Sequence, residues 1–197
     1  MTFQKRKFPD LVFLYIAVVL ISLLCTYTLY QKNISVNQEL IKWQNKATNL
    51  RNELNTINMY STIYDTSPKI IATVIRKSKE YDVNSEIMLE LINTESEFET
   101  QAISKDGAKG LCQLKPTTAK ELTQELNLIY KDDALFDIQY NINIGTYYLA
   151  KLLKTYHGDY HKALTAYNRG PRGLKNYIIR TGSSISNYSL HITNISH

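Results

Sequence analysis

The sequence contains one long apolar stretch near its start. No charged residue lies between Asp10 and Lys32, and Leu11–Leu29 reads LVFLYIAVVLISLLCTYTL. Because a helix rises 1.5 Å per residue, about 20 apolar residues are enough to cross a hydrocarbon core of about 30 Å. The stretch therefore predicts a membrane-spanning helix over residues 11–30.

A cleaved signal peptide is the alternative, since Lys5, Arg6 and Lys7 supply its usual charged start. The apolar run is longer than a typical signal core, and no small-x-small cleavage site follows it. These features favour an uncleaved anchor. Three cations precede the span and only Lys32 closely follows it, so we expect residues 1–10 in the cytoplasm and everything after the span outside the inner membrane.

Residues 31–68 carry an apolar repeat with alternating steps of four and three residues. The repeat consists of Val36, Leu40, Trp43, Ala47, Leu50, Leu54 and Ile57. This spacing is the seam of a coiled coil, but an amphipathic helix packed on its own domain gives the same pattern. We expect a helical spacer, and Trp43 and Ala47 in the seam favour weak self-association at most. Pro68 is well placed as the first residue of the next helix.

Composition favours a helical fold with little net charge in the rest of the chain. Hydrophobic residues make up 44% of the 197, which excludes wholesale disorder, and the 7 Gly and 4 Pro are too few for a turn-rich sandwich or barrel. Basic residues number 23 against 18 acidic ones, and the excess is small after residue 68. We therefore expect a mainly α fold and no nucleic-acid binding.

A carboxylate interrupts the apolar stripe of the helix expected from Glu86 onward. Met88, Leu91 and Ile92 lie on one face, and the next position of that stripe is Glu95. Burial of a carboxyl group opposes its ionisation and raises its pKa, and a carboxylic acid that is protonated near neutral pH is what a general acid needs. A frayed helix end would instead leave Glu95 in water, and periodicity alone does not decide between the two.

Glu95 begins the first of three sequence blocks that follow one another along the chain. They are Glu95–Phe98 (ESEF), Ser104–Ala119 (SKDGAKGLCQLKPTTA) and Ala166–Pro171 (AYNRGP). Together they resemble the catalytic domain of the soluble lytic transglycosylases, which shares the goose-type lysozyme fold. The resemblance covers about residues 70–178. It implies a lysozyme-like helical catalytic domain, which we place at residues 69–180, and leaves 181–197 as a flexible tail.

The resemblance implies cleavage of the β-1,4 bond between N-acetylmuramic acid and N-acetylglucosamine in peptidoglycan, without a cofactor or metal. Glu95 matches the single acid/base, which protonates the glycosidic oxygen and then takes the proton of the muramyl C6 hydroxyl, giving a 1,6-anhydro product. Ser104, Gln113 and Asn168 match substrate-binding positions. Tyr167 matches a tyrosine whose hydroxyl approaches the catalytic carboxyl.

Most glycosidases use a second carboxylate, and the sequence offers no convincing one. Glu97 and Glu99 follow Glu95 too closely to face it across a sugar, and Asp106 is typical of a turn residue before Gly107. A single carboxylate is consistent with substrate-assisted exceptions, in which the N-acetyl group of the sugar supports the reacting carbon.

The chain departs from the family pattern at several positions. Cys112 stands where methionine is common, and we expect it to pack as a small apolar residue. Arg169 replaces the usual small residue, and Arg172 follows; they form either a positive rim that faces the carboxylates of the peptide stems or ordinary solvated arginines.

The sequence thus predicts a lytic transglycosylase tethered to the inner membrane by residues 11–30, with peptidoglycan strands as its substrate. A hydrolase of the same fold, which would use water, is one alternative. An inactive wall-binding or assembly module is another, in which the spacer would recruit a second copy or an envelope-spanning machine. His157 and His161 have a spacing seen in metal sites, but Gly158 breaks the helix between them and no third ligand accompanies them.

Overall fold

The structure, a computed structural model, describes residues 8–194, with side chains from residue 11 onward. It is built of helices, which confirms the predicted mainly α class. Within the described residues no strand forms, and the only extended pairings are isolated bridges in the loop before α4. The elements are α1 (Phe8–Ile63), α2 (Pro68–Glu80), α3 (Ser85–Ser96), α4 (Pro116–Glu125), the 3₁₀ helix η1 (Asp133–Phe136), α5 (Ile138–Thr155), α6 (Tyr160–Thr181) and α7 (Asn187–Asn194).

The predicted membrane span and the predicted spacer belong to one helix, α1. By its length and composition this helix is able to cross a membrane, and its apolar side chains are exposed. Residues 1–7 of the expected cytoplasmic segment lie outside the described part of the chain. The chain divides between Asn55 and Thr56 into two compact units, which are described separately.

The second unit begins earlier than the predicted boundary at residue 69. Tyr60 and Tyr64, at the end of α1, pack against the helical core. The Tyr60 hydroxyl donates to Glu86 Oε1 at 2.8 Å, and the Tyr64 hydroxyl donates to Glu90. Both acceptors lie on α3, so the last turns of α1 are part of the helical domain. The heptad pattern did not reveal this, because it continues into a segment that packs on its own domain.

Polar and proline residues define where the helices begin. Ser67 caps α2, and Pro68 is the first residue of that helix. Asn84 caps α3, because its Oδ1 accepts hydrogen bonds from the backbone amides of Glu86 and Ile87 at 2.8 and 3.1 Å. Asp137 and Asp159 cap α5 and α6 in the same way. Such caps satisfy amides that have no partner inside the helix and fix where each helix starts.

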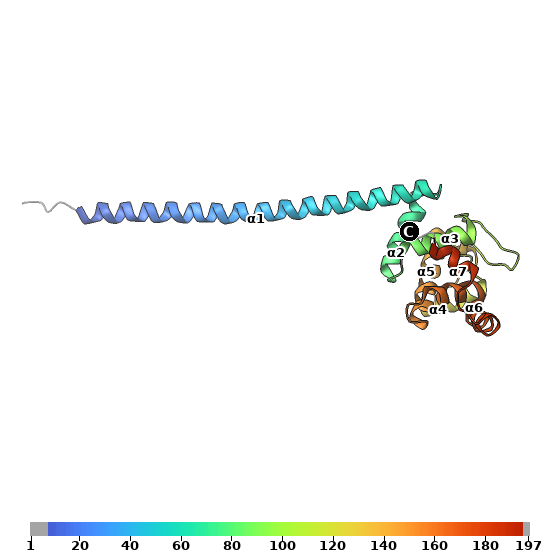
Figure 1. Cartoon of the computed structure of the whole chain (residues 1–197). Coiled ribbons are helices and arrows are strands. Elements are labelled where there is room, and N and C mark those ends of the chain that lie inside the picture. The colour runs from blue at the N-terminus through green and yellow to red at the C-terminus, as the bar shows by residue number, and fades with distance from the viewer. Residues whose placement is uncertain (1–7, 195–197) are drawn as a thin grey trace, which may run out of the picture. The chain divides into compact units, whose positions relative to one another are not determined.

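Helix α5 is the centre of the domain. It packs against α2, α4, α6 and η1, while α7 packs against α3 and α6 (Figure 1). The core between these helices is made of fully buried apolar side chains, among them Ile71, Met88, Leu91, Ile92, Leu111, Leu135, Ile142, Leu149 and Leu164. Helix α3 thereby has a buried apolar face and ends at the domain surface.

The expectation of a flexible tail over residues 181–197 is wrong for residues 187–194, which form α7; residues 195–197 lie outside the described part. Helix α7 is fixed by hydroxyl groups as much as by apolar contact. Thr165 Oγ1 lies 2.8 Å from Ser186 Oγ and donates to Ser184 O, and Ser186 and Ser189 are buried. The few apolar residues of this segment gave no sign of a packed helix, because serine and threonine hydroxyl groups hold it by hydrogen bonds.

Candidate active site

Glu95 lies in the last turn of α3, where the apolar stripe predicts a buried position. The helix ends directly after it, because Glu97 and Phe98 adopt left-handed backbone conformations with φ of 49° and 60°. Such conformations are uncommon for residues other than glycine and occur mainly where the surroundings impose them. The Phe98 ring is buried, whereas Glu97 and Glu99 are exposed, so the chain turn leaves Glu95 half-buried between core and solvent.

The loop between α3 and α4, residues 97–115, faces Glu95 and is held in place by a buried asparagine. Asn141 Oδ1 accepts from the Cys112 amide at 2.8 Å, and its Nδ2 donates to Lys109 O at 3.0 Å and to Leu135 O at 2.6 Å. Ser96 on α3 adds a bond to the same loop, from Oγ to Leu111 O at 2.8 Å. The loop is thus connected to α5, η1 and α3.

Two glycines allow close contacts around this loop. A Cβ atom at Gly110 would lie 2.2 Å from the carbonyl oxygen of Leu135, and one at Gly145 would lie 2.5 Å from Cys112 Sγ. Cys112 is fully buried against α5 and burial raises the pKa of its thiol, so it packs as a small apolar residue.

A cleft of about 380 Å³ opens in front of Glu95. It is lined by Glu95, Ser104, Asp106, Ala108, Gln113, Leu114, Lys115, Thr118, Tyr148, Tyr167, Asn168, Arg169 and Gly170. All five residues that the sequence singled out for catalysis or substrate binding therefore line one cavity, although they come from α3, the loop between α3 and α4, and α6.

The polar groups of the cleft are oriented by the backbone. Ser104 Oγ accepts from the Ala108 amide at 3.0 Å, which leaves the hydroxyl proton available to a ligand. Gln113 Nε2 donates to Gly110 O at 2.9 Å and to Ala102 O at 3.3 Å, so its Oε1 is the atom left to bind substrate.

The position of Tyr167 differs from the expectation in one respect. Its hydroxyl donates to Cys112 O at 2.9 Å, and its ring packs on that of Tyr148 with centroids 5.0 Å apart. The hydroxyl that donates to the glutamate is that of Tyr188 on α7, at 2.6 Å from Glu95 Oε1. The sequence reasoning missed Tyr188; the spacing of Tyr188 and Ile192 on one helix face was the only signal, and it is weak in so short a segment.

Burial raises the pKa of Glu95, and the hydrogen bond from Tyr188 lowers it in part. The first effect disfavours the carboxylate because it is poorly solvated, and the second stabilises the carboxylate by charge-assisted donation. Glu95 therefore keeps its proton to a higher pH than an exposed glutamate does, and it can act as a base after giving the proton up.

Replacing Tyr188 by phenylalanine is expected to raise the pKa of Glu95 further, because the carboxylate loses its donor. Because protonated Glu95 starts the proposed reaction, the alkaline limb of the pH profile of kcat/KM on peptidoglycan is expected to move up by about one pH unit. The value of kcat falls about tenfold, because the carboxylate formed during turnover is less stable. Tyr147→Phe is the matched control, since it removes a hydroxyl that donates to Glu125 at 2.9 Å, away from the cleft. An unchanged alkaline limb in Tyr188→Phe would contradict this role.

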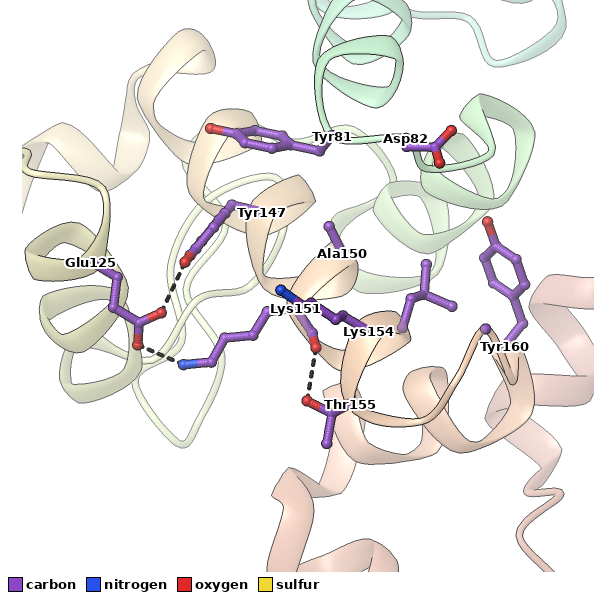
Figure 2. Close-up of a pocket in the computed structure, with 11 residues that line it drawn as sticks. Tyr81, Asp82, Glu125, Tyr147, Ala150, Lys151, Lys154, Thr155 and Tyr160 are labelled. Atoms are coloured by element: carbon purple, nitrogen blue, oxygen red, sulfur yellow. Dashed lines mark hydrogen bonds and ion pairs between the residues drawn. The ribbon is translucent and has the colours of Figure 1, made fainter.

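A second, larger hollow of about 920 Å³ lies between the end of α2, α5 and the start of α6 (Figure 2). Two of its charged groups are paired with each other: Glu125 accepts from Lys151 at 2.5 Å and also from the Tyr147 hydroxyl at 2.9 Å. None of the sequence-predicted site residues lines it. The smaller cleft, which is lined by Glu95 and by the other four of these residues, is therefore the candidate active site.

Comparison with known proteins identifies the family of the helical domain. Residues 72–189 match the model of the family described as "Transglycosylase SLT domain". Among solved structures, lytic transglycosylase Slt of Pseudomonas aeruginosa, in an inactive mutant form, is 26% identical with a TM-score of 0.55; the match covers 63% of this chain and 22% of that one. The 70-kDa soluble lytic transglycosylase of Escherichia coli is 23% identical with a TM-score of 0.53, over 63% and 21% of the two chains.

A complex of the 70-kDa soluble lytic transglycosylase with bulgecin A also matches, at 22% identity, with a TM-score of 0.53 and coverage of 63% of this chain and 21% of that one. The chain thus spans about a fifth of the length of these proteins. The family match, in contrast, covers more than half of the chain and reaches from α2 into α7, so that it includes both Glu95 and Tyr188. The chain belongs to the transglycosylase SLT domain family.

Proposed function

We propose that this protein is a membrane-anchored peptidoglycan lytic transglycosylase that cleaves the N-acetylmuramic acid–β-1,4–N-acetylglucosamine bond and forms a 1,6-anhydromuramyl product. The observation that carries the proposal is the half-buried Glu95, which faces a cleft lined by Ser104, Gln113, Tyr167 and Asn168. Membership of the family supports the choice of substrate.

Glu95 would serve first as acid and then as base. Its proton goes to the glycosidic oxygen while the bond from that oxygen to the anomeric carbon breaks, and the N-acetylglucosamine side leaves as an alcohol. The Glu95 carboxylate then takes the proton of the muramyl C6 hydroxyl, whose oxygen forms a bond to the anomeric carbon. One proton leaves Glu95 and one returns, so the enzyme is restored and no water is consumed.

The surrounding groups have distinct tasks in this scheme. Tyr188 donates to Glu95 and stabilises the carboxylate between the two steps. Gln113 Oε1 and the Ser104 hydroxyl are placed to bind polar groups of the sugars, and Tyr148 contributes an aromatic surface on which a sugar ring can pack.

We also propose that α1 anchors the enzyme, with the N-terminus in the cytoplasm and the catalytic domain on the cell-wall side of the inner membrane. The helix has the required length and composition, and the cations before residue 11 set the orientation. Association of the spacer with a second copy or with an envelope machine stays a prediction.

Mass spectrometry of the released muropeptides tests the proposed chemistry. The full chain in detergent micelles is incubated with purified peptidoglycan, and the products are expected to end in anhydromuramic acid, lighter by one water than the hydrolysis product. Terminal reducing muramic acid in place of the anhydro form would overturn the lyase assignment.

Hydrolysis is the second candidate, and Asp106 favours it. This residue lines the same cleft as Glu95 and is the second carboxylate there among residues 11–194, and an inverting hydrolase uses a second carboxylate to activate water. If the reaction is hydrolysis through Asp106, Asp106→Asn abolishes the release of muropeptides. If the reaction is the lyase reaction, this variant still releases the anhydro product at more than about a third of the normal rate.

A further inference from the structure

Arg169 lies where the candidate active-site cleft meets a small hollow on α6, which is distinct from the 920 Å³ hollow described above. It lines the cleft itself and also lines an adjoining hollow of about 260 Å³. The rest of that hollow is formed by Gly173, Asn176, Tyr177 and Arg180, all on the second half of α6. A ligand that extends out of the cleft past Asn168 would therefore come close to Arg169, which is exposed at the junction.

The kink in α6 creates this arrangement. Gly170 leaves the helical conformation with φ of 73° and ψ of 161°, and Pro171 starts the helix again. The side chain of Arg169 then lies against Gly173, where an added Cβ would be 2.7 Å from Arg169 Cβ. The absence of a side chain at Gly173 thus makes room for Arg169 at the junction.

Two guanidinium groups share one aromatic ring in this hollow. The Cζ atom of Arg169 lies 5.0 Å from the centroid of the Tyr177 ring, and that of Arg180 lies 5.9 Å from it. Contact with the ring stabilises the cations and limits their freedom. Over residues 11–194, neither arginine forms an ion pair; the pairs that do form involve lysines. Two neighbouring cations without a counter-charge are suited to bind an anion.

We infer that Arg169, supported by Arg180 on the Tyr177 ring, is a specificity-determining subsite for a free carboxylate of the peptide stem attached to the bound muramyl residue. This inference rests on the proposed function and adds a recognition element to it. The stem leaves the glycan at the muramyl sugar, next to the bond that is cut, so its carboxylates pass the mouth of the cleft. The forked guanidinium binds a carboxylate through two parallel hydrogen bonds.

Arg172 provides the matched control. It lies three residues further along α6, is exposed, and lines neither the cleft nor the adjoining hollow. The sequence offered Arg169 and Arg172 together as a positive rim, and only Arg169 occupies the position that a substrate would reach.

The test compares three substrates with the full chain in detergent micelles. They are glycan strands with intact stems, the same strands with stem carboxylates converted to amides, and strands from which the stems have been removed. For Arg169→Gln we expect a three- to tenfold loss of kcat/KM on intact strands, mainly through KM, and less than a twofold change on the other two. Arg172→Gln should match the unmodified enzyme on all three, and the preference for intact strands should weaken as salt is raised.

Two results would overturn the subsite. An equal loss by Arg169→Gln on all three substrates would show that Arg169 shapes the cleft without recognising the stem. Equal rates for the unmodified enzyme and Arg169→Gln on intact strands would show that no contact of consequence exists. The proposed function fails separately, if the unmodified enzyme releases no muropeptide from any of the three substrates.

Discussion

Glu95→Gln should abolish the release of muropeptides, with a loss of at least about a thousandfold in kcat. Glutamine keeps the shape of the side chain and the acceptor for Tyr188, but it carries no proton that can be transferred to a glycosidic oxygen. General acid catalysis is typically worth about two to four orders of magnitude, and here one group performs both proton transfers. The measurement is the initial rate of release of soluble fragments from purified peptidoglycan.

Glu97→Gln is the control for this variant. It makes the same chemical change two residues away, at an exposed position that does not line the cleft. We expect it to keep full activity. Residual activity of Glu95→Gln above about a tenth of normal would remove Glu95 from the catalytic role.

The same substitution should stabilise the protein at neutral pH. The pKa of Glu95 is raised on folding, so the ionised side chain opposes folding. Below the pKa of the unfolded chain the carboxyl is protonated in both states and the two proteins have similar free energies of unfolding. As pH rises through the folded-state pKa, the unsubstituted protein loses stability and Glu95→Gln does not. Urea unfolding followed at pH 3.5 and pH 7.5 measures the difference.

Asn141→Ala should be the most damaging change to the fold among the site-supporting residues. It removes one acceptor and two donated hydrogen bonds. The buried Cys112 amide and the Leu135 carbonyl lose their partner, whereas the Lys109 carbonyl keeps its bond from the Leu114 amide at 3.1 Å. Unsatisfied buried groups each cost about 1–3 kcal/mol, so we expect a loss of about 3–5 kcal/mol in the free energy of unfolding. This corresponds to a fall of roughly 10 °C in Tm for a unit of this size.

Asn176→Ala controls for the loss of an asparagine side chain, because Asn176 is exposed on α6. It should change the free energy of unfolding by less than about 0.5 kcal/mol. Both variants are compared by urea unfolding, followed by the near-ultraviolet circular dichroism of the tyrosines, which lie largely in the helical domain. A loss below about 1 kcal/mol for Asn141→Ala would mean that the loop is held by other contacts.

Much of the helical domain was predictable because its signals are local. The stripe of Met88, Leu91 and Ile92 placed Glu95 at the edge of the core, and Pro68 marked a helix start that the structure contains. The glycine-containing loop and the Ala166–Pro171 block had the order and spacing of the family. Residues from three separate segments could therefore be assigned to one cleft.

The parts that escaped prediction depend on contacts between distant segments. Tyr188 follows Glu95 by 93 residues, and its helix is docked through Ser186 and Ser189, residue types that usually indicate solvent exposure. The early start of the domain has a similar cause. Tyr60 and Tyr64 reach glutamates on α3 through their hydroxyls, and neither contact leaves a periodic signal in the sequence.

The dependence of Glu95 on α7 has a consequence for the order in which the protein matures. Ribosomes make and translocons export a chain from its N-terminus, so residues 187–194 emerge after every other segment that forms the cleft. The acid gains its phenolic partner only when residues 187–194 have been made and have docked against α3 and α6. A nascent or truncated molecule would thus have its glutamate but lack the group that tunes it, and its activity would stay low until the fold is complete.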